Sequence, residues 1–133
     1  QQKVVSLTAY KVLSIELAAG LGHTFYDNET DYETVYFDQE IQHDFASWVS
    51  GNSMEPLYPN GSVALMKQTG FDYDGAVYAL IWNGKTYIKK VYREAEGLRL
   101  ESINPDYDDL FAPYEDEPKI VGIVVGHFLP LEV

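Results

Sequence analysis

Short segments rich in β-branched and aromatic residues, separated by turn-forming residues, restrict the fold of this chain more than any other feature. β-Branched and aromatic side chains favour strands, whereas Gly, Pro, Asn and Asp favour turns. About eight such segments follow one another with little helical periodicity, which predicts a mainly β fold of antiparallel strands with one or two short helical turns. After an extended or short-strand lead-in over residues 1–16, the expected strands are residues 34–37, 45–49, 62–66, 76–82, 86–91, 98–103 and 120–128.

A serine follows a glycine in the turn after the strand at 45–49. Residues 50–56 read Ser-Gly-Asn-Ser-Met-Glu-Pro, and Pro56 fits the first turn of a short helix over residues 54–58. Such a turn exposes the Ser53 hydroxyl and directs backbone N–H groups at the space beside it. Turn statistics alone favour a plain Gly/Ser/Pro turn without chemistry, so the interpretation depends on what else the chain contains.

Two adjacent lysines, Lys89 and Lys90, lie in the expected strand at 86–91, which follows the hairpin signal Asn83-Gly84. Burial of an unpaired ammonium group is costly, and strand alternation allows only one of the two lysines to point inward. One interpretation is an edge strand with two solvated lysines. The other is a desolvated lysine whose lowered pKa makes it the general base that a serine nucleophile needs. Lys67 competes for this role, although its polar neighbours indicate solvent exposure.

Small residues form a third stretch, upstream of the serine, where Ala19 and Gly20 lie within residues 17–22. Small side chains allow an extended backbone to enter a narrow active site. Residues 17–30 lack clear periodicity and include a polar run at 27–30. We therefore expect an exposed, mobile loop there.

Together these stretches resemble the C-terminal, self-cleaving domain of LexA-type repressors, the family that includes phage CI-like repressors and the UmuD mutagenesis protein. The resemblance rests on Ala19-Gly20 and on residues 49–54, 87–91 and 120–126, which occur in the family's order and at close to its spacing. It implies a LexA/signal-peptidase-like fold and a Ser–Lys dyad that cuts one peptide bond of its own chain.

By this resemblance, the hydroxyl of Ser53 attacks the carbonyl of Ala19. Neutral Lys89 accepts the hydroxyl proton and later gives it to the leaving amine of Gly20. Backbone N–H groups of Asn52 and Ser53 hold the oxyanion, as they do at the matching positions of the family. Water then hydrolyses the ester.

Lys89 is expected to be the base because in the family the base is the first of a basic pair after an apolar residue, although alternation permits Lys90 as well. The chain also departs from the family. Many members carry Gly-Asp where this chain has Gly61-Ser62 and Gly75-Ala76. Those aspartates shape turns around the core, so the departures concern the turns and not the dyad.

The 133 residues fit one domain, and the net charge of −12, from nine Lys and Arg against 21 Asp and Glu, disfavours contact with DNA phosphates. The chain starts at Gln1, and both of its methionines are internal, so we expect a fragment of a longer protein. Residues 1–30 are expected to be a hinge and cleavable segment, and residues 31–133 a peptidase and dimerisation domain. In the family, a helix-turn-helix domain precedes this one, and operator DNA would be bound only through that missing domain.

Several kinds of site are not expected. The chain has no cysteine, which fits a reducing compartment and a cytoplasmic location, and no apolar run approaches the roughly 18 residues of a membrane span. His23, His43 and His127 show no ligand-like spacing, and the acidic residues at 27–40 lack the pattern of a calcium loop. We expect no metal and no cofactor.

The leading functional expectation is a LexA-like or phage-type repressor domain that dimerises and cleaves itself between Ala19 and Gly20. The family implies stimulation by a RecA filament on single-stranded DNA in the SOS response. It also implies a homodimer, because such repressors bind two-fold symmetric operators. The strand at residues 120–128, or a strand next to it, is the candidate interface. The alternatives are a UmuD-like polymerase accessory, a signal-peptidase-like processing enzyme and a non-cleaving dimerisation module.

Overall fold

The computed structural model describes residues 6–20 and 32–132, and the nine strands in these residues form a single mixed sheet. The predicted mainly β fold is confirmed. Two short helical elements accompany the strands in the described residues, the α-helix α1 (Ile15–Gly20) and the 3₁₀ turn η3 (Tyr114–Asp116). The strands are β1 (Thr8–Val12), β2 (Glu33–Phe37), β3 (Phe45–Trp48), β4 (Val63–Lys67), β5 (Val77–Trp82), β6 (Lys85–Arg93), β7 (Gly97–Glu101), β8 (Leu110–Pro113) and β9 (Lys119–Phe128).

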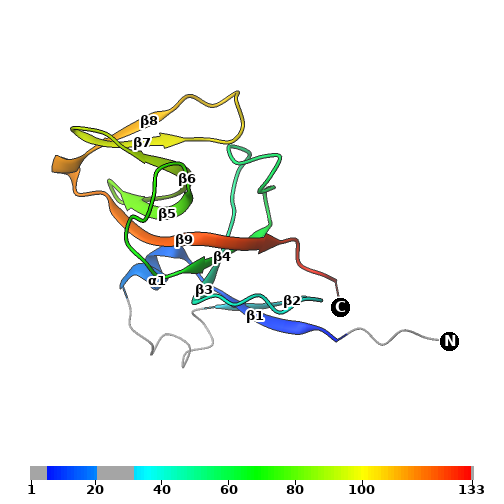
Figure 1. The fold of residues 1–133 in the computed structure, drawn as a ribbon. Helices are drawn as coiled ribbons and strands as arrows, with labels where there is room; N and C mark the ends of the chain where they lie inside the picture. The colour runs from blue at the N-terminus through cyan, green and yellow to red at the C-terminus, as the bar shows by residue number, and fades with distance from the viewer. Residues whose placement is uncertain (1–5, 21–31, 133) are drawn as a thin grey trace.

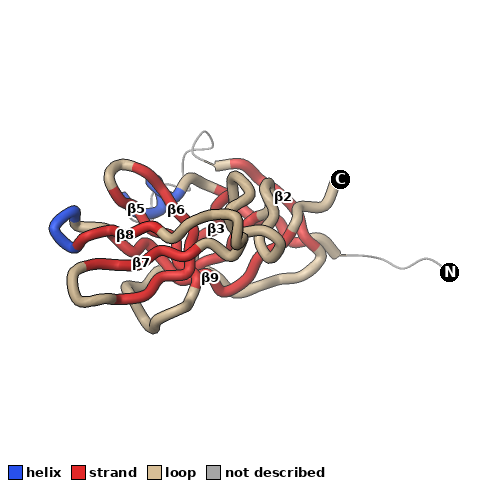
Figure 2. Tube along the Cα trace, turned by 90° about the horizontal axis from the view of Figure 1, so that it is seen from above, coloured by secondary structure: helices blue, strands red, loops and turns tan. Residues whose placement is uncertain are grey.

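The last strand, β9, joins the two halves of the sheet, whose order is β2-β1-β3-β4-β9-β5-β6-β7-β8. Figure 1 shows β9 crossing the middle of the molecule, with β1 and β2 on one side and β7 and β8 on the other. In Figure 2, β5, β6, β7 and β8 gather at the end of the molecule opposite to the C-terminus. Neighbouring strands are antiparallel except β1 and β3, which pair in parallel through Val12 and Ala46, so the predicted antiparallel arrangement is incomplete.

One apolar cluster packs the helix α1 and the β3–β4 connection, which contains Ser53, against the central strands. It combines α1 with residues of the central strands and with Met54 and Tyr58 from the β3–β4 connection. Two further clusters lie at β5–β7 and at β1, β3 and β4. Since burial of a side chain such as methionine contributes roughly 1.5–3 kcal/mol, the cluster stabilises both α1 and the connection that follows β3.

Over residues 17–20, the helix α1 replaces the first part of the loop expected over residues 17–30. Ser14 caps it, with its Oγ accepting a hydrogen bond from the Leu17 N–H at 3.1 Å, and Ile15 and Ala18 bury their side chains. The helix packs against β5 and β9. A polar cap and two buried residues three positions apart are too brief a signal for periodicity to be recognised. His23 and the polar run at 27–30 lie outside the described residues.

Two other elements differ from the prediction. Strand β8 was not expected, because its four residues lie among acidic residues and end in a proline; it forms by pairing with β7. Close approach of the two strands needs Gly97, where a Cβ atom would collide with the Ala112 carbonyl oxygen. Over residues 54–58 the chain makes one helical hydrogen bond, from the Tyr58 N–H to the Met54 carbonyl oxygen, and forms a turn instead of a helix.

The hairpin predicted at Asn83 and Gly84 is confirmed. Both residues have positive φ, 51° and 73°, as a two-residue turn between antiparallel strands requires. The turn sets the register of β5 against β6, in which Tyr78 lies opposite Lys89. In the described part of the chain, no helix is long and apolar enough to cross a membrane.

Candidate active site

The connection between β3 and β4 carries Ser53. Val49 extends the hairpin beyond β3, since its N–H donates to the Ser62 carbonyl oxygen and its carbonyl accepts from the Gly61 N–H, both at 2.8 Å. At the start of the turn, Gly51 adopts a φ of 83°, which favours glycine, and its N–H donates to Asn60 Oδ1 at 2.7 Å. Buried Met54 and Tyr58 anchor the other side. The turn is therefore held from both ends, with Ser53 half-buried between them.

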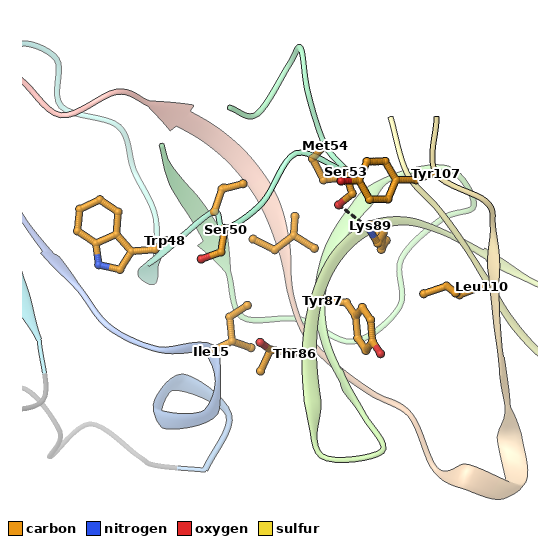
Figure 3. Close-up of a pocket in the computed structure, with 12 residues that line it drawn as sticks. Ile15, Trp48, Ser50, Ser53, Met54, Thr86, Tyr87, Lys89, Tyr107 and Leu110 are labelled. Atoms are coloured by element: carbon orange, nitrogen blue, oxygen red, sulfur yellow. Dashed lines mark hydrogen bonds between the residues drawn. The ribbon is translucent and has the colours of Figure 1, made fainter. Parts of the chain in front are cut away.

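Lys89 reaches Ser53 from the middle of β6. Its Nζ donates a hydrogen bond to Ser53 Oγ at 2.6 Å (Figure 3). It donates a second hydrogen bond to Ser102 Oγ at 2.9 Å. The side chain is only 7% exposed, and this burial lowers the pKa of Lys89 below the ordinary 10.5. The site therefore brings a hydroxyl and a partly desolvated amine within direct hydrogen-bond reach, the geometry that a serine nucleophile and its base require.

The two competing lysines lie elsewhere. Lys90 points to the opposite face of β6, where its Nζ lies 3.3 Å from the Glu101 carboxylate. Hydrogen bonds to Glu101 and, secondly, to Tyr92 raise the pKa of Lys90. Lys67 is exposed at the end of β4, as its neighbours indicated. Of the three candidates, only Lys89 contacts Ser53.

A cavity of about 300 Å³ opens beside the Ser53–Lys89 pair. In Figure 3, Met54 and Tyr107 lie next to the pair, whereas Ile15 and Thr86 lie farther from it. A cavity of this size and mixed lining accommodates a few peptide side chains next to the hydroxyl. The residues that line it are Ile15, Trp48, Val49, Ser50, Ser53, Met54, Thr86, Tyr87, Ile88, Lys89, Tyr107 and Leu110.

Ser102 was not identified from the sequence, although a signal for it exists. In β7 and just beyond it, Leu98, Leu100 and Ser102 are at alternate positions, and all three are buried. Strand alternation thus places a serine where the pattern calls for an apolar side chain. A buried hydroxyl needs a partner, and Lys89 is that partner.

The two expected oxyanion residues, Asn52 and Ser53, lie in the turn itself. Their carbonyl oxygens accept hydrogen bonds, that of Asn52 from the Asn104 side chain at 3.0 Å and that of Ser53 from the Asn104 N–H at 2.9 Å. Within residues 6–20 and 32–132, the N–H groups of Asn52 and Ser53 donate to no protein acceptor. Neither N–H is therefore occupied by another protein group of the described residues.

Comparison with protein families decides the relationship. Residues 11–125 match the family described as Peptidase S24-like. The chain belongs to the Peptidase S24-like family. The match includes the turn with Ser53, strand β6 with Lys89 and most of β9, so both members of the pair lie inside the domain that defines the family.

Individual relatives of this Peptidase S24-like chain are regulators by name. It is 31% identical over 118 residues to "LexA repressor" of Lacticaseibacillus casei (strain BL23), which covers 86% of this chain and 55% of the relative. It is 40% identical over 77 residues to "Repressor protein CI" of Enterobacteria phage phi80, covering 56% and 32%. A third relative is "HTH-type transcriptional regulator PrtR" of Pseudomonas aeruginosa, 34% identical over 80 residues, covering 57% and 31%. The predicted resemblance to LexA- and CI-type repressors is confirmed, and the chain spans about half the length of the LexA relative.

The Peptidase S24-like structure does not bring Ala19 and Gly20 into the cavity. They end α1, and the Ala19 carbonyl oxygen accepts a hydrogen bond from Lys119 Nζ at 3.1 Å. Ile15, four residues earlier, lines the cavity, whereas Ala19 does not. The expected cleavage position is thus helical and bound to β9, outside the cavity that holds the expected catalytic pair.

Two histidines are described in this Peptidase S24-like domain, and both are engaged in packing. His43 Nδ1 lies 2.7 Å from the Ile41 carbonyl oxygen, and the His127 ring packs edge-on against Tyr58. Across the described ranges, no three His, Asp or Glu side chains lie close enough together to hold a metal ion.

Proposed function

We propose that this Peptidase S24-like domain cleaves its own chain between Ala19 and Gly20, with Ser53 as the nucleophile and Lys89 as the general base. The observation that carries the proposal is the 2.6 Å contact between Lys89 Nζ and Ser53 Oγ. A serine hydroxyl is a weak nucleophile without a base at this distance. Burial lowers the pKa of Lys89 and so raises the fraction of neutral amine available at a given pH.

The reaction begins when Ser53 Oγ attacks the carbonyl carbon of Ala19 and its proton passes to neutral Lys89. Collapse of the tetrahedral intermediate breaks the bond between the Ala19 carbon and the Gly20 nitrogen, and Lys89 returns the proton to that nitrogen. The Ala19 acyl group remains as an ester on Ser53. A water molecule, deprotonated by Lys89, then hydrolyses the ester and restores the hydroxyl.

Ser102 and the turn supply the remaining groups. A neutral lysine has two N–H donors and one lone pair, and Ser102 Oγ, 2.9 Å from Nζ, takes one of the donors. This leaves the lone pair free to face Ser53. The N–H groups of Asn52 and Ser53 stabilise the negative oxygen of the tetrahedral intermediate.

Cleavage needs a rearrangement of α1. The Ala19 carbonyl must leave Lys119, and the helix must unwind so that residues 19 and 20 reach Ser53. A six-residue helix is marginal by itself and depends on its packing, so loss of that packing is the main cost of the docked arrangement. A partner that favours the docked arrangement would accelerate cleavage without contributing a catalytic group, and we propose a RecA filament on single-stranded DNA as that partner in the SOS response.

For the whole protein we infer a LexA-like or phage-type transcriptional repressor of the cytoplasm. The relatives named above, a LexA repressor, a phage CI repressor and a transcriptional regulator, support this inference. Operator DNA would be bound by a separate domain, because a net charge of −12 makes this domain a poor partner for phosphates. A homodimer would pair two such domains.

The test is the mass of the purified chain after incubation between pH 7 and pH 10 without any other protease. We expect two fragments that separate after Ala19, and none from the Ser53→Ala variant. A rate independent of protein concentration indicates cleavage within one chain, whereas a rate that rises with concentration indicates a processing enzyme acting between chains. An unchanged mass at pH 10 contradicts self-cleavage.

A further inference from the structure

We propose that Asn104 is a positioning residue that orients the peptide unit between Asn52 and Ser53, so that the Ser53 N–H faces the reacting carbonyl oxygen. The inference rests on the proposed self-cleavage and extends it to a residue outside the dyad and its turn. Asn104 lies in the connection between β7 and β8, far in sequence from Ser53.

Asn104 holds the turn at two successive carbonyl groups. Its side-chain Nδ2 donates to the Asn52 carbonyl oxygen at 3.0 Å, and its main-chain N–H donates to the Ser53 carbonyl oxygen at 2.9 Å. The other end of the amide is also engaged, since Oδ1 accepts from the Asp106 N–H at 2.9 Å. Nδ2 faces an acceptor and Oδ1 faces a donor, so only one of the two orientations of the amide satisfies both hydrogen bonds.

Because the peptide unit is rigid, the hydrogen bond from Asn104 to the Asn52 oxygen also fixes the direction of the Ser53 N–H. A trans peptide is planar, so the carbonyl of Asn52 and the N–H of Ser53 belong to one plane and point in opposite directions. A hydrogen bond that holds the Asn52 oxygen toward Asn104 therefore turns the Ser53 N–H away from Asn104. The Asn52 oxygen also accepts from the Glu55 N–H at 3.2 Å, and the Gly51 N–H, two residues before that of Ser53, is held by Asn60. Asn104 therefore orients the 52–53 unit together with these contacts within the turn.

The short segment from Ser102 to Asn104 also contacts the base, Lys89. Ser102 contacts Lys89 Nζ, and two residues later Asn104 contacts the turn of Ser53. The two residues act on different quantities. Ser102 affects the protonation of Lys89, whereas Asn104 affects an N–H that stabilises the transition state and exchanges no proton.

This difference gives a test by pH profile. Self-cleavage of the chain is measured by intact mass across alkaline pH for the wild type, Asn104→Leu and Asn104→Ala. Both variants are neutral and remove the Nδ2 donor, and the leucine side chain keeps most of the volume. We expect the plateau rate to fall about 10- to 100-fold, less than the roughly 100- to 1,000-fold loss that follows complete removal of an oxyanion donor. The pH midpoint, which belongs to Lys89, stays where it is.

Asp106→Ala is the matched control. Asp106 is exposed in the same loop, and its replacement keeps the backbone N–H that donates a hydrogen bond to Asn104 Oδ1. We expect its plateau rate to equal that of the wild type. Circular dichroism identifies the folded variants, and either folded Asn104 variant decides the matter.

A plateau within twofold of the wild type overturns the inference, while Ser53→Ala inactivity leaves the proposed function standing. A midpoint that shifts together with the plateau also overturns it, because it indicates general loosening of the site. If the wild type itself does not cleave, the proposed function fails, and the role of Asn104 fails with it.

Discussion

Lys119 Nζ lies 3.1 Å from the carbonyl oxygen of Ala19, so the peptide unit proposed for cleavage is bound to β9 while it ends α1. The hydrogen bond is exposed, and its contribution is therefore on the order of 1 kcal/mol or less. Its loss should favour opening of the helix. We expect Lys119→Ala to accelerate self-cleavage about two- to fivefold, measured as the rate of fragment appearance by mass.

Lys85→Ala is the control for this acceleration. Lys85 is exposed at the start of β6 and loses the same charge, so a general effect of reducing the positive charge would appear in both variants. A rate for Lys119→Ala that equals or falls below the wild-type rate would contradict a restraining role for the contact.

The second prediction follows from the opposite directions in which the side chains of the two adjacent lysines leave β6. Lys89 contacts Ser53, and Lys90 is paired with Glu101 on the other face of β6. A general base contributes about 100- to 10,000-fold, so Lys89→Ala should reduce cleavage to the limit of detection, whereas Lys90→Ala should keep most of the rate. Intact-mass assays at one alkaline pH suffice. An active Lys89→Ala variant together with an inactive Lys90→Ala variant would reverse the assignment of the base.

Ser102 gives the third prediction, which concerns the position of the pH profile. Its Oγ accepts a hydrogen bond from Lys89 Nζ, and such a bond stabilises the charged ammonium more than the neutral amine. In Ser102→Ala the pKa of Lys89 should fall further. We expect the midpoint of the rate profile to move to lower pH and the plateau to decrease, because the lone pair is less well oriented. A midpoint that moves to higher pH would show that Ser102 does not act as this acceptor.

Local sequence patterns predicted those features that local interactions determine. The Asn83-Gly84 turn specifies a hairpin by its backbone conformation alone, and the strand segments follow from alternation. In contrast, α1 depends on the burial of Ile15 and Ala18 against β5 and β9, which are distant in sequence. Strand β8 likewise exists through its pairing with β7.

The residues of the site also differ in whether local sequence or distant contacts determine their roles. The turn of Ser53 favoured a plain turn by itself, and the serine was singled out only in combination with the lysine strand and the upstream small residues. Lys89 was expected from the family resemblance, whereas strand alternation alone left Lys90 open, because the facing depends on the register of β6 against β5. Asn104 could not be recognised at all, since its contacts lie in a segment more than 50 residues away along the chain, where it meets the backbone of Asn52. Backbone contacts of this kind leave no pattern in the residues they reach.

Dimerisation is the fourth prediction. Strand β9 is paired on both edges, with β4 and β5, so an interface there would use exposed side chains and not strand addition. Val125 on β9 is 43% exposed and suits such a contact. We expect sedimentation to show a dimer at micromolar concentration and Val125→Asp to shift it toward monomer. A wild-type chain that remains monomeric would contradict the homodimer, and a dimeric Val125→Asp variant would place the interface elsewhere.

The last prediction concerns stability and follows from the burial of Lys89, which lowers its pKa in the folded state below the unfolded value near 10.5. Between the folded and unfolded pKa values the unfolded chain binds more protons, so the free energy of unfolding of the wild type rises with pH in that window. Below the folded pKa the cost of burying the ammonium is fully present.

Lys89→Met removes this titration while keeping an unbranched side chain. We therefore expect the stability of the variant relative to the wild type to be highest near neutral pH and to decrease as pH rises toward 10.5, measured by urea unfolding at several pH values. A difference that stays constant, or that grows with pH, would show that Lys89 is not desolvated in the folded domain.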